Sequence, residues 1–214
     1  MKTRTATAER ILDASRRIFN AKGYAATTLT EIAADIGISQ GNLTYHFPTK
    51  RDLAMRLVAD ARQQSQARRA AKCPAAIADD YVEHLLFAMD LTWNSRFVLR
   101  DRAQLKELLG LGGTDTELSA DFNELYQLIR RISKEKLFRH DLEIDLQKLT
   151  RSLWIVSRYW MDYLRESEDL EEITWAHQER GIEQHFTVLL PCLTASARKE
   201  FNAALAKQSK RLGA

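Results

Sequence analysis

The stretch TLTEIAADIGISQGNLTYHF, residues 28–47, decides the fold of the first third of the chain. Thr28 with Glu31 three residues later matches a capping box, which predicts a helix of about two turns starting there. Ser39 is a second favoured N-cap residue and predicts another short helix over 40–46. The segment is therefore predicted to hold two short helices in succession.

The turn between these two helices is predicted from a glycine and an apolar plug. Gly37 stands at the position that favours a positive φ, and Ile38 is placed to plug the turn into the core. Helices that cross steeply need small or branched apolar side chains where they touch, and Ala33 is small enough to let them approach. Together these features predict a helix-turn-helix, whose inward positions are Ile32, Ala33, Ile36, Ile38, Leu43 and Phe47.

Helices are also predicted on both sides of this motif. Apolar residues recur at helical spacing from about 7 to 22, and Gly23 follows where a left-handed residue ends a helix. Thr49 with Asp52 is a further capping pattern and opens a helix at Lys50. The first half of that helix has an apolar stripe and the second half is very polar, so we expect it to link two domains.

The rest of the chain also shows helical periodicity. Gly and Pro number only 8 and 3 in 214 residues, and no strand alternation, repeat or low-complexity tract is found. The predicted fold class is all-α: an N-terminal three-helix helix-turn-helix domain, residues 1–49, joined by a long helix to a second helical domain within residues 50–214. The later helices are expected over 75–94, 97–109, 116–139, 146–166, 171–190 and 195–208, with a loop over 110–116.

The composition is typical of a globular protein that needs no disulfide or structural metal ion to fold. Hydrophobic residues make up 45% and charged residues 29% of the chain, and no run approaches the roughly 18 apolar residues needed to span a bilayer. The two cysteines, Cys73 and Cys192, lie far apart and match no metal-binding spacing. We therefore expect free thiols, no metal site, no membrane insertion and a location in a reducing cytoplasm.

Positive charge is concentrated in the first 70 residues. They hold 12 Lys and Arg against 6 Asp and Glu, a net charge of +6, whereas residues 71–214 hold 20 against 23, a net charge of −3. Neutralisation of phosphates by basic residues supplies much of the nonspecific affinity of proteins for DNA. The asymmetry points to a polyanion as the partner of the first third of the chain.

The second helix of the motif turns polar side chains outward. With Leu43 and Phe47 inward, Gln40 and Asn42 lie on its N-terminal half, which is the half that reads base edges in the major groove. Side chains near its end, and the N–H groups and charge at other helix starts, suit contacts to phosphate. The alternative is a plain helical hairpin with a polar face. The predicted DNA contacts are Thr28, Ser39, Gln40, Asn42, Thr44, Tyr45, His46 and Lys50.

The segments TLTEIA (28–33) and GISQGNLTYHFPTK (37–50) resemble the TetR family of one-component bacterial regulators almost throughout. The departure is Thr44, where many members carry an aromatic residue. The resemblance implies sequence-specific binding to double-stranded operator DNA through three helices followed by a long fourth, without catalysis or a cofactor. It also implies a homodimer formed by the last two long helices, which pack with those of the partner as a four-helix bundle.

The second domain is expected to bind a small-molecule effector. The helix predicted over 75–94 is apolar on two sides, so it should run through the middle of the domain, and aromatic residues gather on it and on later helices. A cavity lined by them would suit an apolar or amphipathic ligand, and ordinary core packing is the alternative for any single residue. The candidate contacts are His84, Trp93, Phe97, Arg100, Phe122, Tyr126, Trp154 and Tyr159.

The mode of regulation follows from the geometry of a dimer. Two recognition helices meet successive major grooves when they are about 34–36 Å apart, so a ligand that tilts the long fourth helix would change operator affinity. In the family such binding usually releases a repressor, whereas some members activate. The resemblance therefore implies a repressor, with a ligand-dependent activator as the alternative.

Two other classes of protein are possible in principle. An enzyme would need a cluster of reactive groups, but His177 and His185 lie two turns apart on one helix face, and Gly110–Gly113 does not match the glycine pattern of dinucleotide-binding proteins. We therefore expect no catalytic residues. The second class is a helical protein-interaction module, which the salt dependence of DNA binding distinguishes from a regulator.

Overall fold

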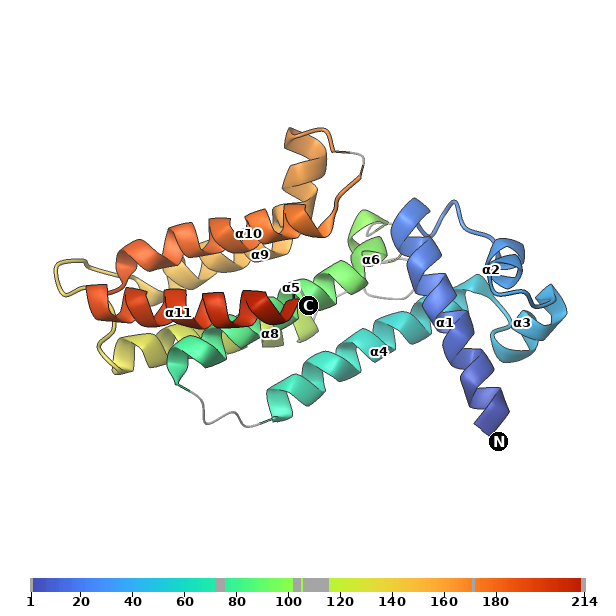
Figure 1. Ribbon diagram of the computed structural model, residues 1–214, viewed down its shortest axis with the longest axis horizontal. Coiled ribbons are helices and arrows are strands. Elements are labelled where there is room, and N and C mark those ends of the chain that lie inside the picture. The colour runs from blue at the N-terminus through green and yellow to red at the C-terminus, as the bar shows by residue number, and fades with distance from the viewer. Residues whose placement is uncertain (1, 72–75, 102–104, 106–115, 171, 213–214) are drawn as a thin grey trace. The chain divides into compact units, whose positions relative to one another are not determined.

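The computed structural model describes residues 2–71, 76–101, 105, 116–170 and 172–212 and confirms the all-α fold (Figure 1). Among these residues the only β-type pairing is one isolated antiparallel bridge, between Phe138 and Leu193. None of the described helices is long and apolar enough to cross a membrane. Cys73, the Gly110–Gly113 run and most of the loop predicted around it lie outside the described residues.

The chain forms two compact units. Unit 1 comprises Met1–Arg68 with Leu91–Asp115, and unit 2 comprises Arg69–Asp90 with Thr116–Ala214. Unit 1 contains α1 (Lys2–Lys22), α2 (Leu29–Asp35), α3 (Gln40–His46), nearly all of α4 (Lys50–Ala70), and α6 (Arg96–Arg100). Unit 2 contains most of α5 (Ile77–Asn94), and α8 (Thr116–Lys134), α9 (Leu146–Ser167), α10 (Trp175–Leu189) and α11 (Ala195–Leu212).

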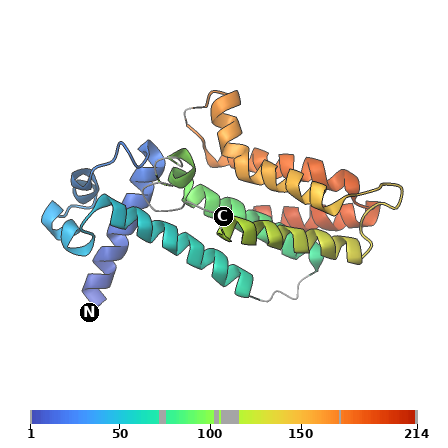
Figure 2. The ribbon, with the colours of Figure 1, turned by 180° about the vertical axis from the view of Figure 1, so that it is seen from behind.

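The core of unit 1 confirms the predicted helix-turn-helix packing. Ile32, Ala33 and Leu43 are buried, and they pack with apolar residues of α1 and α4. The other three predicted inward residues are partly buried against the same core; they are Ile36, Ile38 and Phe47. Figures 1 and 2 show α2 and α3 side by side, next to α1 and the start of α4. The helices of the motif are therefore held by one small hydrophobic core.

The core of unit 2 is organised around α5, as predicted from its two apolar sides. Tyr81, Val82, Leu85 and Met89 are among its buried residues, and they pack with apolar side chains of α8, α9, α10 and α11. These helices run alongside one another in both ribbon views (Figures 1 and 2). A short 3-10 turn, Leu190–Cys192, separates α10 from α11.

The predicted helix over 116–139 is too long at its C-terminal end. α8 ends at Lys134, because Lys136 takes a positive φ of 57°, which a continuing helix does not allow. The chain then pairs with the segment before α11: Arg139 N–H donates to Cys192 O at 2.9 Å, and Thr194 N–H donates to Leu137 O at 2.8 Å. These contacts between distant segments were not predictable from helical periodicity.

Two further helix ends differ from the prediction. α10 begins at Trp175 rather than at 171, because Thr174 is its N-cap and shares a capping box with His177. α6 ends at Arg100, whereas the prediction extends to 109. Of residues 101–109, the structure describes only two, Asp101 and Leu105.

Helices α9 and α10 approach each other closely at a glycine. A Cβ added at Gly181 would lie 2.5 Å from Trp160 Cδ1 of α9. The indole cannot easily retreat, because its Nε1–H donates a hydrogen bond to His177 O at 2.7 Å. The bare backbone of Gly181 is therefore what lets the tryptophan lie against α10.

We predict that Gly181→Ala destabilises the protein by about 1–3 kcal/mol, because the new methyl group forces the indole or the helix to move. Denaturant unfolding followed by circular dichroism measures this loss. Gly41→Ala is the matched control, since the nearest atom to its added Cβ is Ser39 Oγ at 4.0 Å. Equal stabilities for the two variants would contradict the prediction.

Candidate nucleic-acid interface

The capping residues predicted from the sequence hold the ends of α2 and α3. Thr28 Oγ1 accepts a hydrogen bond from Glu31 N–H at 3.2 Å, and Thr28 N–H donates to Glu31 Oε2 at 2.9 Å, which confirms the capping box. Ser39 Oγ accepts from Asn42 N–H at 3.1 Å. Gly37 has a φ of 69°, as the turn requires. The motif is thus fixed by local hydrogen bonds at each of its ends.

Charged side chains of α1 fasten α2 along its length. Arg17 forms an ion pair with Asp35, and Lys22 forms one with Glu31 of the capping box. Arg10 donates to Ile36 O at the C-terminal end of α2, at 2.8 Å. These contacts lie at the surface, so each contributes little to stability alone. Together they orient α2 against α1.

The third helix presents its polar side chains to solvent. Leu43 is fully buried, whereas Gln40 and Asn42 are exposed and Tyr45 is 65% exposed. Thr30 Oγ1 donates to Gln40 Oε1 at 2.8 Å, so the position of this side chain is set by α2 before any ligand arrives. An exposed short helix carrying amide and phenol groups is the surface a recognition helix offers to a major groove.

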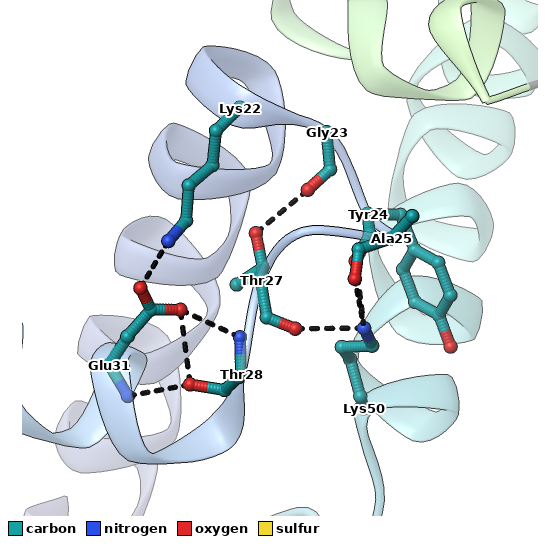
Figure 3. A network of polar contacts seen from close by, with 8 residues as sticks. All are labelled: Lys22, Gly23, Tyr24, Ala25, Thr27, Thr28, Glu31 and Lys50. Carbon is teal, nitrogen blue, oxygen red and sulfur yellow. Dashed lines mark hydrogen bonds and ion pairs between the residues drawn. The ribbon is translucent and has the colours of Figure 1, made fainter.

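Lys50 is turned inward, onto the loop between α1 and α2. Its ammonium donates to Tyr24 O at 2.8 Å, Thr27 O at 2.8 Å and Ala25 O at 3.2 Å (Figure 3). It also lies 4.4 Å from the centre of the Tyr24 ring. A lysine ammonium has three donors and no acceptor, so the three carbonyl groups can use its whole hydrogen-bonding capacity.

This inward position changes what Lys50 can offer to DNA. Burial lowers the pKa of the Lys50 ammonium, and the negative charges of Asp101 and Glu31 act in the opposite direction. The sequence predicts a contact between the charge of Lys50 and a phosphate. In the structure the partly buried ammonium binds the α1–α2 loop of unit 1, and the phosphate contact stays a prediction. Its backbone N–H lies in the first turn of α4, where helix N–H groups can face an anion.

The residues predicted to line a ligand cavity are divided between the two units. Trp93, Phe97 and Arg100 belong to unit 1. There Phe97 is buried in the core, and Arg100 donates to Ala21 O of α1 at 3.1 Å. The other five belong to unit 2; they are His84, Phe122, Tyr126, Trp154 and Tyr159.

Three of those five residues form a row of aromatic rings in unit 2. The Phe122 and Trp154 rings lie 6.1 Å apart, and the Trp154 and Tyr159 rings lie 6.0 Å apart. In both pairs the edge of one ring meets the face of the other. The row joins α8 to α9, so it brings together residues that are 32 positions apart in the sequence.

The two histidines of α10 have separate local roles. His177 accepts a hydrogen bond from Thr174 N–H through Nδ1 at 3.0 Å, as part of the helix cap. His185 is fully buried between Tyr81 Oη at 2.7 Å and Ser157 Oγ at 2.8 Å, and burial lowers its pKa to about 3. No group of three His, Cys, Asp or Glu able to hold a metal is found among the described residues.

The geometry of unit 1 defines a helix-turn-helix DNA-binding protein, and comparison with known families agrees. The model of bacterial regulatory proteins of the tetR family matches residues 11–57. A second model, described as bacterial transcriptional repressor, matches residues 62–201. The chain therefore belongs to the tetR family of bacterial transcription regulators.

Individual relatives resemble this chain to different extents. The uncharacterized HTH-type transcriptional regulator YerO of Bacillus subtilis (strain 168) is 49% identical over 47 residues, which cover 22% of this chain and 16% of YerO. The chain spans well under half the length of the curated relatives it matches. The sequence similarity to YerO is therefore limited to a short segment of both proteins.

Solved structures resemble the chain over most of its length. A TetR-family regulator from Marinobacter aquaeolei VT8 is 25% identical, covers 94% of this chain and 98% of its own, and has a TM-score of 0.69. A putative transcriptional regulator from Saccharomonospora viridis, solved in complex with choline, is 17% identical, covers 86% and 96%, and has a TM-score of 0.62. The likeness at 17% identity concerns the fold alone.

The capping box makes the stability of unit 1 dependent on pH. The Lys22 ammonium and then the Thr28 N–H group lower the pKa of Glu31 from 4.5 to about 2. A carboxylate with a lowered pKa stabilises the fold above its unfolded pKa, and this contribution is lost as the pH falls through the folded value.

We therefore predict that the stability difference between the wild type and Glu31→Gln narrows as the pH falls from about 4.5 to about 2. Urea unfolding at a series of pH values measures the difference. Glu9→Gln, an exposed charge on α1 outside the capping box, controls for the loss of charge alone. A stability difference that stays constant over this pH range would be evidence against the ionised capping box.

Proposed function

We propose that this protein is a dimeric transcriptional repressor that leaves its operator when a small molecule binds in unit 2. The observation that carries the proposal is α3, an exposed polar helix whose position is set by caps, by Gly37 and by the buried Leu43. A recognition helix needs this combination of a fixed backbone and solvent-exposed polar side chains. Binding to the chromosome would place the protein in the cytoplasm.

In the proposed complex α3 reads the major groove and its neighbours grip the backbone. Gln40 and Asn42 carry amide groups on the N-terminal half of α3, and they are the proposed base-reading residues. Tyr45 and His46 follow on the C-terminal half and are proposed to contact phosphate or sugar. The remaining proposed contacts are Thr28, Ser39, Thr44 and the backbone N–H of Lys50.

Repression and release by an effector are supported by the second part of the chain. The family model that covers residues 62–201 is described as a bacterial transcriptional repressor. The Saccharomonospora viridis regulator, which has the same fold, binds choline. In this chain we propose the paired rings of Phe122 and Trp154 as part of the effector site, because aromatic rings suit an apolar or cationic small molecule. Tyr159 continues the row at the exposed face of α9 and is assigned below to the dimer contact.

The proposed division of labour assigns residues 1–49 to DNA binding and residues 50–214 to effector binding and dimerisation. α6 and Asp101 lie in the second of these segments but belong to unit 1. We therefore propose that α6 and Asp101 belong to the DNA-binding part of the protein and help to position its helices.

An exposed stripe on α9 supports dimerisation. Ile155, Tyr159 and Tyr163 are 36–48% exposed and recur every four residues. The buried residues of α9, such as Leu153, Met161 and Leu164, lie on the opposite side of the helix. An apolar stripe that faces away from the core of its own unit fits a contact with a second copy of the chain.

We predict that binding to operator DNA falls steeply with salt, because basic and N–H groups displace counterions from the phosphates. Asn42→Ala should relax the preference for the operator over other sequences, whereas Tyr45→Ala should weaken binding to all sequences alike. A gel-shift titration with operator and scrambled duplexes at several salt concentrations distinguishes these effects.

Asn202→Ala, an exposed asparagine of α11, is the control for the Asn42 substitution. Salt-insensitive binding, or no binding to any genomic fragment, would overturn the regulator in favour of a protein-interaction module. For the mode of regulation, a thermal-shift screen of metabolites identifies an effector. Tighter rather than weaker operator binding with that effector would indicate an activator.

The double variant Ile155→Glu and Tyr163→Glu should convert the dimer to a monomer, because the charges would be buried without partners at the twofold contact. Sedimentation velocity measures the change in mass. Leu142→Glu makes the same kind of change at a side chain that is 41% exposed and lies outside α9, and it should leave the dimer intact. If the α9 double variant also stays dimeric, the stripe is not the interface.

A further inference from the structure

Helix α6 is fastened to the C-terminal end of α1 by an asparagine with two bonds. Asn20 Oδ1 accepts from Phe97 N–H at 3.0 Å, and Asn20 Nδ2 donates to Asn94 O at 2.9 Å. Asn94 is the last residue of α5. The Asn20 side chain of α1 therefore holds both the end of α5 and the start of α6. Arg100 adds a third bond, to Ala21 O at 3.1 Å.

The next residue along the chain, Asp101, holds the loop that follows α1. Asp101 Oδ2 accepts from Tyr24 N–H at 2.5 Å. Gly23 has a φ of 91°, and a Cβ added there would lie 3.1 Å from Asp101 Oδ2. A side chain at residue 23 would therefore be strained in its own backbone and would crowd the carboxylate.

Tyr24 is held from both sides, by the charged C-cap residue of α6 and by the first residue of α4. Its N–H binds Asp101, and its carbonyl oxygen binds the ammonium of Lys50 at 2.8 Å. Its ring meets that of Phe19 edge to face at 5.4 Å, and Phe19 in turn contacts Phe97 of α6 at 5.3 Å. The loop residue Tyr24 is thus the point at which α6 and the start of α4 meet.

Lys50 stands close to the recognition helix in the chain. α3 ends at His46 with Phe47 as its C-cap, and α4 begins at Lys50. The ammonium of Lys50 fixes the start of α4 to the α1–α2 loop, and the short connection passes this constraint to α3. A shift of the loop by α6 would therefore move the anchor of the segment that carries α3.

We propose that Asp101 and Lys50 are a coupled pair of positioning residues, linked through Tyr24, by which the seating of α6 on the α1–α2 loop sets the operator affinity of α3. The proposal rests on the operator binding proposed above. α5 is one continuous helix from unit 2 into unit 1, and its last residue is bonded to Asn20. A change at the C-terminal end of α5 can therefore reach the recognition helix through hydrogen bonds of Asn20, Asp101 and Lys50.

The proposal is tested by a double-mutant cycle on operator affinity. The probe is a duplex selected by the wild-type protein from a random-sequence pool. Lys50→Met and Asp101→Ala should each raise the Kd about tenfold, and the double variant should raise it by about the same factor rather than a hundredfold, because both break one link. A hundredfold loss in the double variant would show independent residues and overturn the proposal.

A substitution elsewhere in unit 1 supplies the matched control. Arg17→Ala removes the ion pair of α1 with Asp35 of α2 and involves neither α6 nor Tyr24, so any effect it has should multiply with that of Lys50→Met. If Arg17→Ala shows the same non-additivity, the coupling is not specific to the link through Tyr24 and the proposal fails. A wild-type protein that selects no duplex at all would instead overturn the proposed function.

Hydrogen exchange provides a reading that does not depend on DNA. In the full chain, Lys50→Met should speed the exchange of the Tyr24 amide hydrogen. That amide donates to Asp101 and not to Lys50, so faster exchange would show that the two contacts of Tyr24 are coupled. Asp101→Asn is the conservative variant should Asp101→Ala fail to fold, because it keeps an oxygen acceptor for Tyr24 N–H. Exchange at Tyr24 that is unchanged by Lys50→Met in a folded protein would contradict the link.

Discussion

The ammonium group of Lys50 and the three carbonyl oxygens that it binds hold the DNA-binding unit together at the α1–α2 loop. A charge can be partly withdrawn from water when its donors find acceptors, and three backbone carbonyls that the loop turns toward one point provide them. The recognition helix is only a few residues upstream of this anchor. The orientation of the recognition helix therefore depends on a contact made by residues outside that helix.

Local features of the fold were predictable, because their partners are close in the sequence. The capping boxes Thr28–Glu31 and Thr49–Asp52 each join residues three apart, and the structure confirms both. The loop contacts of the Lys50 ammonium were not predictable, because its acceptors lie 23 to 26 residues away. Nothing in the pattern around a lysine at a helix start shows whether its charge turns to solvent or to a loop of its own chain.

The same limit applies to the residues near α6. The predicted ligand contacts of Phe97 and Arg100 stay predictions. The contacts of Phe97 with the core of unit 1 and of Arg100 with Ala21 O were not predictable from the sequence. Asn20 and Phe97, which lie 77 residues apart, show why: a side chain that bridges two elements in space has no signature in either one. The unit that binds DNA is therefore completed by residues far beyond its own motif.

A crystal structure of the protein on its operator would show whether Lys50 anchors the recognition helix in the bound state. We expect Lys50 Nζ to remain on the carbonyl oxygens of Tyr24, Ala25 and Thr27, Asp101 to remain on Tyr24 N–H, and Asn42 to face the major groove. Finding Lys50 Nζ turned outward onto a phosphate, with the loop carbonyls released and α3 in the same position, would contradict this expectation.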